Sequence, residues 1–124
     1  MAKIDVALIG AGGMANSVHY PSLVDFEDVN LVGLCDLVES RCHETANRFG
    51  IENRYTDYQK MINDTSPTAV YVLMPPQDLF VPVINCLQRG IHVFVEKPLG
   101  LTTYQAREMA QLAEKNSCLT MVGF

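Results

Sequence analysis

The sequence is poor in positive charge and in long apolar runs, and each shortage excludes a class of protein. Nine Lys and Arg residues face 14 Asp and Glu residues, so the formal net charge is -5. A basic footprint for nucleic acid and a polybasic stripe for anionic lipid are both missing. No apolar run reaches the roughly 18 residues that a transmembrane helix requires. A secretory signal is not recognisable either, because Asp5 interrupts a short apolar stretch that leads into a glycine turn. We therefore expect a soluble protein that binds neither nucleic acid nor membranes.

Cysteine and histidine are also sparse, which argues against a disulfide scaffold and a metal site. The cysteines form no C-x-x-C pair, and a disulfide-stabilised fold would need a shorter or more cysteine-dense chain. The histidines are scattered, so we interpret them as surface residues or hydrogen-bonded structural residues and expect no metal. We expect reduced thiols in a cytoplasmic protein. The residues in question are Cys35, Cys42, Cys86, Cys118, His19, His43 and His92.

What is present is a chain of one domain's length with enough apolar residues for a core. It has 124 residues, of which 48% are hydrophobic, so wholesale disorder is excluded. Short apolar runs alternate with helical patterns, and near-continuous apolar strands are typical of a parallel sheet covered by helices on both faces. This alternation predicts a Rossmann-type, doubly wound α/β fold with a mainly parallel, six-stranded sheet over residues 1–124. The predicted strands are 3–9, 31–35, 69–73, 91–95 and 118–122, with a shorter one near 54–56.

Helices are expected between these strands. Apolar residues repeat at helical spacing over 38–49, 80–87 and 106–113. A shorter helix should follow the first strand over 13–20. Pro21 lacks an N–H group, so we expect it to kink or restart that helix.

A glycine-rich motif follows the first predicted strand. The hexapeptide Gly-Ala-Gly-Gly-Met-Ala that begins at Gly10 fits the pattern G-x-G-x-x-G/A. Gly10 permits a tight turn, Gly12 lets the backbone approach a pyrophosphate, and Ala15 lets the helix pack close to the strand. The phosphates of a dinucleotide would meet free N–H groups and the positive end of the helix. We count Gly13 and Met14 among the cofactor-binding residues. Met14 and Tyr20 could both contact a cofactor, but core packing would explain either one at least as well.

An acid ends the second predicted strand. Asp36 follows Ala15 at the spacing of about 20 residues at which a carboxylate accepts hydrogen bonds from the adenosine ribose of NAD. The 2′-phosphate of NADP would meet this carboxylate, and Arg41 could soften the clash. We therefore predict NAD as the cofactor, with NADP less favoured. The alternative is an ordinary turn between strand and helix, followed by a solvated aspartate.

A second set of functional candidates stands at the end of the fifth predicted strand. The tripeptide Glu96-Lys97-Pro98 lies at the carboxyl edge of the sheet, where open α/β sheets bind ligands. Alternation along the strand sends Glu96 and Lys97 to opposite faces, so they are not simply each other's salt-bridge partner. Lys97 could hydrogen-bond a substrate hydroxyl or assist its deprotonation beside a nicotinamide. By position alone, a lysine that extends into water explains it equally well.

Together these motifs resemble the Gfo/Idh/MocA family, the group of glucose–fructose oxidoreductase and inositol dehydrogenase relatives. The shared order is the glycine motif, the Asp after the second strand, a Pro-Pro after the fourth, Glu-Lys-Pro after the fifth and a final Val-Gly-Phe. The resemblance covers essentially all of residues 1–124, but only the family's N-terminal nucleotide-binding domain. It implies a C-terminal substrate domain that is absent from this chain, and a full-length protein that is a homo-oligomer.

The resemblance also implies roles for individual residues. Lys97 matches the family's catalytic lysine, and Glu96 matches the acid on the nicotinamide side of the pocket. Met74, Pro75 and Pro76 match a Thr-Pro-Pro segment near the cofactor's ribose. Met74 replaces the threonine of that segment, so its hydroxyl is missing here. The implied reaction is hydride transfer between nicotinamide and a small-molecule sugar, cyclitol or related polyol, in a full-length enzyme of which this chain alone is inactive. Two other interpretations stay open, an NAD-dependent glycoside hydrolase and a non-catalytic NAD(H)-binding or sensing module.

Overall fold

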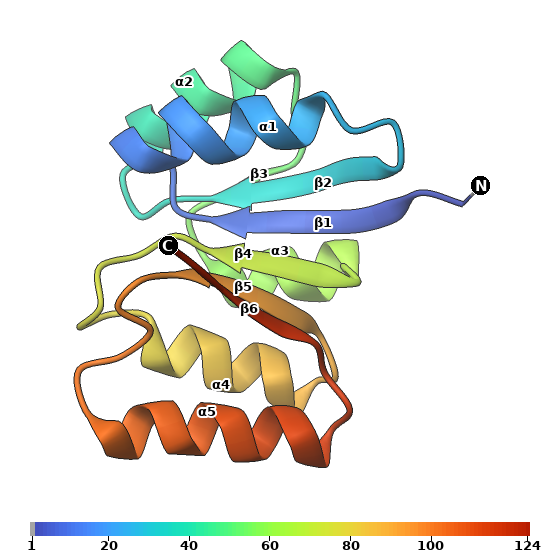
Figure 1. Cartoon of the computed structure of the whole chain (residues 1–124). Coiled ribbons are helices and arrows are strands. Elements are labelled where there is room, and N and C mark those ends of the chain that lie inside the picture. Colours follow the sequence, from blue (N-terminus) through green and yellow to red (C-terminus); the bar gives the residue numbers. More distant parts are fainter. Residues whose placement is uncertain (1) are drawn as a thin grey trace.

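The computed structural model describes residues 2–124, which form one six-stranded sheet with helices on both faces (Figure 1). The strand order is β3-β2-β1-β4-β5-β6, and every neighbouring pair is parallel. This is the order of a doubly wound sheet, in which the direction of winding reverses between β1 and β4. The predicted Rossmann-type fold is confirmed.

The predicted strands are all present, with ends that differ from the prediction by at most two residues. The strands are β1 (Ile4–Ile9), β2 (Val29–Cys35), β3 (Arg54–Tyr55), β4 (Ala69–Val72), β5 (His92–Glu96) and β6 (Thr120–Gly123). The helices are η1 (Ala15–His19), α1 (Tyr20–Val24), α2 (Glu39–Phe49), α3 (Tyr58–Thr65), α4 (Phe80–Gln88) and α5 (Thr103–Lys115). None of the helices in this part of the chain is long and apolar enough to cross a membrane.

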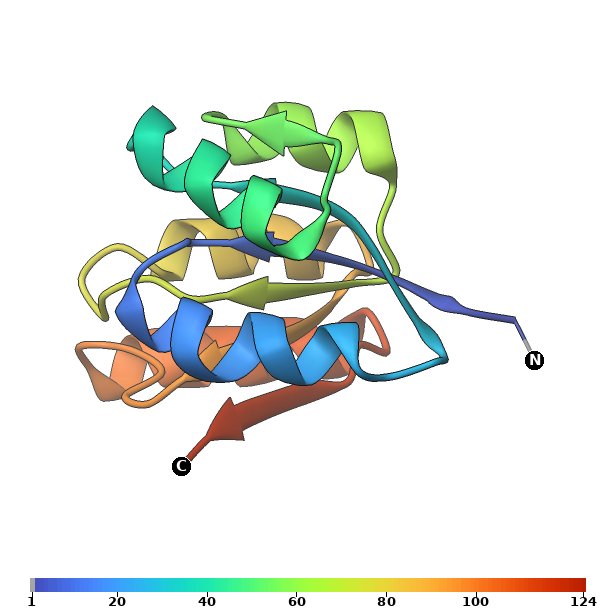
Figure 2. The ribbon, with the colours of Figure 1, turned by 90° about the horizontal axis from the view of Figure 1, so that it is seen from above.

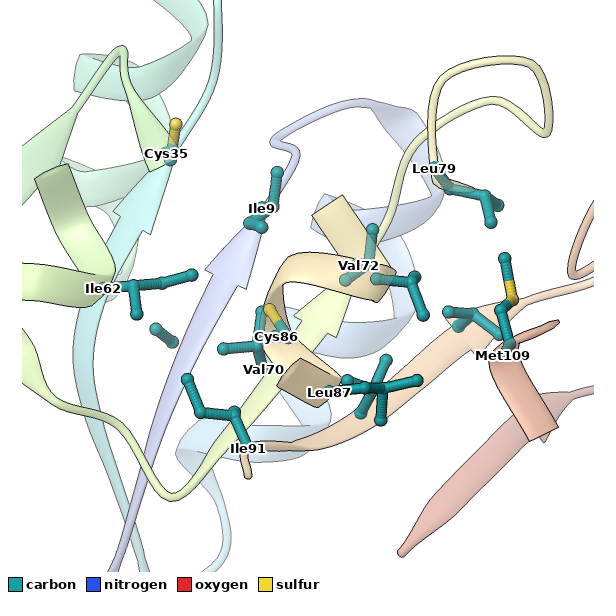
Figure 3. Close-up of a cluster of buried hydrophobic side chains, with 14 of the residues drawn as sticks. Ile9, Cys35, Ile62, Val70, Val72, Leu79, Cys86, Leu87, Ile91 and Met109 are labelled. Carbon is teal, nitrogen blue, oxygen red and sulfur yellow. The ribbon is translucent and has the colours of Figure 1, made fainter. Parts of the chain in front are cut away.

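Helices cover the two faces of the sheet unequally. Helices η1, α1 and α2 pack over one face of β1 to β3, whereas α3, α4 and α5 cover the other face (Figures 1 and 2). The larger core lies between the sheet and α3 to α5, where Val70, Val72, Cys86 and Leu87 are fully buried (Figure 3). On the face that bears α1, the described chain places no helix over β5 and β6, and Figure 2 shows β6 projecting beyond α1.

The helix after β1 begins with a π turn, in agreement with the predicted interruption at Pro21. In a regular α-helix the ring of Pro21 would clash with the carbonyl of Ser17. The widened turn, closed by the Tyr20 N–H bonding to the Ala15 carbonyl, accommodates the proline at the start of α1. Both His19 and Tyr20 are buried as a result.

Helix α3 is missing from the sequence-based prediction. Its N-terminus is capped by Asp57, whose carboxylate accepts the N–H of Gln59 at 2.9 Å. Met61 and Ile62 are buried one turn later. In the sequence, an aspartate followed by this apolar pair could have indicated the helix. The helix carries the chain from β3 to β4 and so reverses the direction in which the sheet is built.

Candidate functional site

A cleft of about 770 Å³ opens at the carboxyl ends of the central strands. Its walls are the turn after β1, the segment after β2, the start of α3 and the segment after β4. This is the point at which the strand order reverses, where doubly wound sheets bind their ligands. The predicted cofactor residues that line it are Gly10, Gly12, Asp36, Arg41, Met74 and Pro75.

Gly10 and Gly12 differ in whether the fold leaves room for a side chain. Gly10 has a φ of +112°, and a Cβ atom there would lie 2.2 Å from the carbonyl oxygen of Leu73, so the fold excludes a side chain. At Gly12, in contrast, no described atom lies within 4 Å of the position a Cβ would take. The bare backbone at Gly12 is therefore unexplained by internal packing, and it suits a ligand that approaches closely.

Side chains bind the carbonyl groups of the turn. The hydroxyl of Tyr20 donates to the Gly10 carbonyl at 2.9 Å, and Asn16 Nδ2 donates to the carbonyls of Ala11 and Gly12, both at 3.0 Å. The first helical hydrogen bond runs from the Asn16 N–H to the Gly12 carbonyl. The N–H of Gly12 lies before this bond, so the helix offers it no carbonyl acceptor. The turn thus offers N–H groups and keeps its carbonyls engaged, an arrangement that suits a pyrophosphate.

Asp36 connects the second strand to this turn. The side chain is 8% exposed, and its Oδ2 accepts the Ala11 N–H while its Oδ1 accepts the Val38 N–H, both at 2.8 Å. The Arg41 guanidinium lies 3.4 Å from Oδ1. Each carboxylate oxygen has a second lone pair, so Asp36 can accept a further hydrogen bond from a ribose hydroxyl.

The cleft has a wall that sequence reasoning missed. Thr56, Asp57 and Tyr58 follow β3, and Asp78 follows β4. The sequence patterns predict a strand here but no helix after it, although the N-cap pattern at Asp57 could have indicated the start of α3. Arg41 is the one Lys or Arg among the residues that line the cleft. Its walls are therefore mainly apolar and acidic.

Other predicted site residues lie outside the cleft lining. Ala15 begins η1 and is buried in the core, where its small side chain permits close packing against the sheet. Met14 is 57% exposed, so the alternative that core packing explains it is wrong. Tyr20 belongs to the core, where it stacks on Phe49. The predicted residues that do not line the cleft are Gly13, Met14, Ala15, Pro76, Glu96 and Lys97.

Glu96 and Lys97 stand at the same edge of the sheet but in different surroundings. The carboxylate of Glu96 bonds to His19, on the face of the sheet that bears α1. Lys97 is exposed and takes part in none of the ion pairs found within residues 2–124. His19 is thus a buried structural residue, one of the two interpretations that the sequence left open.

The cysteines are unpaired thiols, and burial makes them poor nucleophiles. Burial raises the pKa of Cys35 to about 12 and that of Cys86 to about 12. Both thiols are therefore protonated at neutral pH. Burial also raises the pKa of Tyr20, which keeps its hydroxyl a donor to Gly10. Within the described residues, no three His, Cys, Asp or Glu side chains are grouped closely enough to hold a metal ion.

The strand order, the glycine turn at its reversal point and the acid after β2 define a dinucleotide-binding Rossmann domain. The profile of the GFO_IDH_MocA family, described as an oxidoreductase family with an NAD-binding Rossmann fold, matches residues 4–124. The chain belongs to this family.

Relatives of the chain include sugar and inositol dehydrogenases. D-glucoside 3-dehydrogenase of Escherichia coli K12 is 36% identical over 114 residues, which are 92% of this chain and 32% of that protein. Myo-inositol 2-dehydrogenase of Thermotoga maritima is 29% identical over 119 residues, 96% of this chain and 35% of that protein. The crystal structure of GenD2 from gentamicin A biosynthesis, in complex with NAD, matches with a TM-score of 0.92 at 28% identity, covering 99% of this chain and 35% of that one. The chain spans about a third of the length of the curated relatives it matches.

Proposed function

We propose that this chain is the cofactor-binding part of an NAD-dependent oxidoreductase that acts on a sugar, cyclitol or related polyol. The observation that carries the proposal is the cleft in which the glycine turn and Asp36 meet, joined by the hydrogen bond from the Ala11 N–H to the Asp36 carboxylate. The names of the relatives, D-glucoside 3-dehydrogenase and myo-inositol 2-dehydrogenase, support the substrate class.

Residues that line the cleft and residues beside it have distinct roles in this proposal. The N–H groups at Gly12 and Gly13 bind the pyrophosphate, and Asp36 accepts hydrogen bonds from the adenosine ribose. Met74 and Pro75, with the adjoining Pro76, bound the ribose on the nicotinamide side. When bound, NAD supplies the hydride chemistry, and the protein supplies orientation and electrostatics. Lys97 holds or accepts the proton of the substrate hydroxyl, and Glu96 stands beside it on the strand end.

We propose a preference for NAD over NADP on the same grounds. A 2′-phosphate would approach Asp36 in a cleft that Asp57 and Asp78 also line. Arg41 is the one guanidinium available, and it already lies 3.4 Å from Asp36. Like charges close together in a partly enclosed site repel, so the cleft disfavours the additional phosphate.

We propose that the substrate contacts come from a second domain. This chain corresponds to about a third of its curated relatives, which leaves room in a protein of their size for a substrate domain that also forms a homo-oligomer. The unpaired thiols of residues 2–124 support a cytoplasmic location, where such thiols persist.

Titration and turnover of the 124-residue protein test this proposal. We expect saturable NAD(H) binding by calorimetry or NADH fluorescence, and no NADH formation over a panel of sugars and cyclitols. Turnover needs a substrate held within about 3–3.5 Å of the nicotinamide and shielded from water, and we assign those contacts to the second domain. Absence of NAD(H) binding would refute the cofactor role, and rapid NADH formation by this chain alone would show that the substrate site is misplaced. In a longer protein that contains this domain, net NADH production would separate a dehydrogenase from an NAD-dependent glycoside hydrolase.

A further inference from the structure

One titratable pair, a buried histidine and a partly exposed glutamate, does not line the cleft. His19 is 8% exposed, and its Nε2 lies 2.5 Å from Oε1 of Glu96, whose side chain is 27% exposed. His19 ends η1, in the helix that begins at the glycine turn, and Glu96 is the last residue of β5, directly before Lys97. The pair therefore joins the cofactor-binding helix to the end of the strand that carries the lysine.

Aromatic rings hold the imidazole of His19 in place. The ring packs edge-to-face against Tyr71, with centroids 5.7 Å apart, and against Phe94, at 5.1 Å. Tyr71 and Phe94 stack on each other at 4.5 Å. Rings packed in this way leave the imidazole little freedom to rotate, so its Nε2 stays directed at Glu96.

The π turn ties this pair to the glycine turn. It buries two successive residues, His19 and Tyr20, on the side of the helix that faces the sheet. Tyr20 donates its hydroxyl proton to the Gly10 carbonyl, while His19 bonds to Glu96. One turn of helix thus contacts both the phosphate-binding loop and the end of β5.

Strand β6 leaves space for the pair. Gly123 stands opposite Glu96 in the register of β5 and β6. A Cβ atom at Gly123 would lie 2.8 Å from Cζ of Phe94 and 3.1 and 3.2 Å from the two carboxylate oxygens of Glu96. A side chain would displace the ring or the carboxylate, so the glycine of the final Val-Gly-Phe preserves the arrangement around Glu96.

We propose that His19 and Glu96 are a positioning pair that sets where Lys97 stands relative to the nicotinamide of a bound cofactor. The inference rests on the proposed function. Lys97 has no ion-pair partner within residues 2–124, so the backbone of the strand end determines its place. His19 fixes that strand end to the helix whose N-terminus binds the pyrophosphate. To accept a proton, Lys97 must stand within about 2.6–3.2 Å of the substrate hydroxyl oxygen. A mobile strand end would not hold it at that distance.

Lysine NMR on the 124-residue protein tests the proposal. The chain has four lysines, Lys3, Lys60, Lys97 and Lys115, so with ¹³Cε-labelled lysine the Lys97 signal is assigned by its loss in Lys97→Arg. The ligands are NAD⁺ and ADP-ribose, which lacks the nicotinamide. In the wild type we expect NAD⁺ to shift the Lys97 signal further than ADP-ribose does. In His19→Ala we expect the two ligands to give the same shift, with both dissociation constants within about threefold of wild type.

Matched variants separate positioning from general stability. His19→Gln, whose amide can donate to Glu96, should restore the additional shift caused by NAD⁺. His43→Ala is the control, because His43 also contacts a glutamate, Glu39 at 3.3 Å, but on the exposed surface of α2. It should leave the shift unchanged. If the pair only stabilised the fold, His19→Ala would lower the urea midpoint and keep the additional shift, and the proposal would be overturned.

The outcomes distinguish this inference from the proposed function. If wild type binds neither ligand, the proposed function fails. If wild type binds both and Lys97 responds to them identically, or if His19→Ala retains the additional shift, the inference fails and cofactor binding stands. Should His19→Ala not fold, Glu96→Ala makes the same test from the partly exposed partner, and an unchanged NAD⁺-dependent shift there would overturn the pair's role.

Discussion

The N–H of Ala11 donates to the carboxylate of Asp36 at 2.8 Å, so the acid after β2 holds the glycine turn that lies 25 residues earlier in the chain. The two halves of the expected cofactor site are therefore one hydrogen-bonded unit before any ligand arrives. Removing the Asp36 side chain abolishes both the hydrogen bond to the turn and the ribose contact. An asparagine keeps one acceptor oxygen, but it places an NH2 donor where the second carboxylate oxygen accepts a backbone N–H.

Asp36 should determine cofactor preference. We expect wild type to bind NAD(H) more tightly than NADP(H), and Asp36→Ala to lose that preference. A hydrogen bond to a charged group contributes roughly 1.5–3 kcal/mol, about 10- to 150-fold in affinity. Calorimetric titration of both cofactors against wild type, Asp36→Ala and Asp36→Asn measures the effect. Equal or reversed dissociation constants in wild type would refute this role of Asp36.

Alanine at Gly10 should lower stability, whereas alanine at Gly12 should weaken cofactor binding. Gly10→Ala places a Cβ 2.2 Å from the Leu73 carbonyl oxygen at a positive φ, so we expect a loss of at least about 3 kcal/mol in the free energy of unfolding. Gly12→Ala meets no described atom within 4 Å and should stay within about 1 kcal/mol of wild type. It should nevertheless weaken NAD binding by at least about tenfold, because the methyl group occupies the phosphate approach. Urea unfolding and cofactor titration measure the two effects, and wild-type affinity in Gly12→Ala would contradict the assigned site.

Tyr20→Phe tests the support beneath the glycine turn. The substitution removes the hydroxyl that donates to the Gly10 carbonyl at 2.9 Å and keeps the ring that stacks on Phe49. We expect a loss of about 1 kcal/mol in the free energy of unfolding, because a partly buried carbonyl loses its donor. Tyr104→Phe, at a side chain 65% exposed, is the matched control and should have no effect. Equal stability of both variants would show that the Tyr20 hydroxyl is not required.

Stability should fall above pH 9 because of buried thiols. The pKa of Cys35 and that of Cys86 are each raised from 9.0 to about 12 by burial, so the folded state keeps protons that the unfolded state has released. The stabilisation is therefore complete below pH 9 and is lost as pH rises toward 12. Each thiol should reduce the free energy of unfolding by about 1.4 kcal/mol per pH unit within that window. Urea titrations at pH 8, 9 and 10 measure the slope, and an unchanged slope in Cys86→Ala would contradict the assignment to Cys86.

Lys97→Ala should separate binding from turnover. The side chain is exposed and does not line the cleft, so we expect NAD(H) affinity of the 124-residue protein to stay within about threefold of wild type. In a longer protein that contains this domain, the same change should abolish turnover, because it removes the group assigned to the hydroxyl proton. Lys60→Ala, on the surface of α3, is the control in both assays. Turnover that survives in Lys97→Ala would remove Lys97 from the reaction.

Much of the fold was predictable because it depends on local patterns. The apolar strand segments and the helical repeats between them specify alternating elements, and right-handed crossovers leave few ways to arrange these in one sheet. The glycine motif and Asp36 were recognisable because a turn and a strand end are local events. Helix α3 was not predicted because it has 8 residues and its buried apolar residues are one adjacent pair, Met61 and Ile62, which shows no helical repeat.

The alternation of strands and helices, the glycine turn and the acid after β2 could be predicted from the amino-acid sequence, because hydrophobic periodicity and backbone sterics act over a few residues. Which side chains meet across long separations in the chain depends on the packing of the folded protein. His19 and Glu96 are 77 residues apart and become neighbours because a π turn rotates His19 toward the sheet while β5 and β6 bring Glu96 beside Gly123. Contacts of that kind depend on how helices and strands pack against one another, which no local pattern in the sequence records.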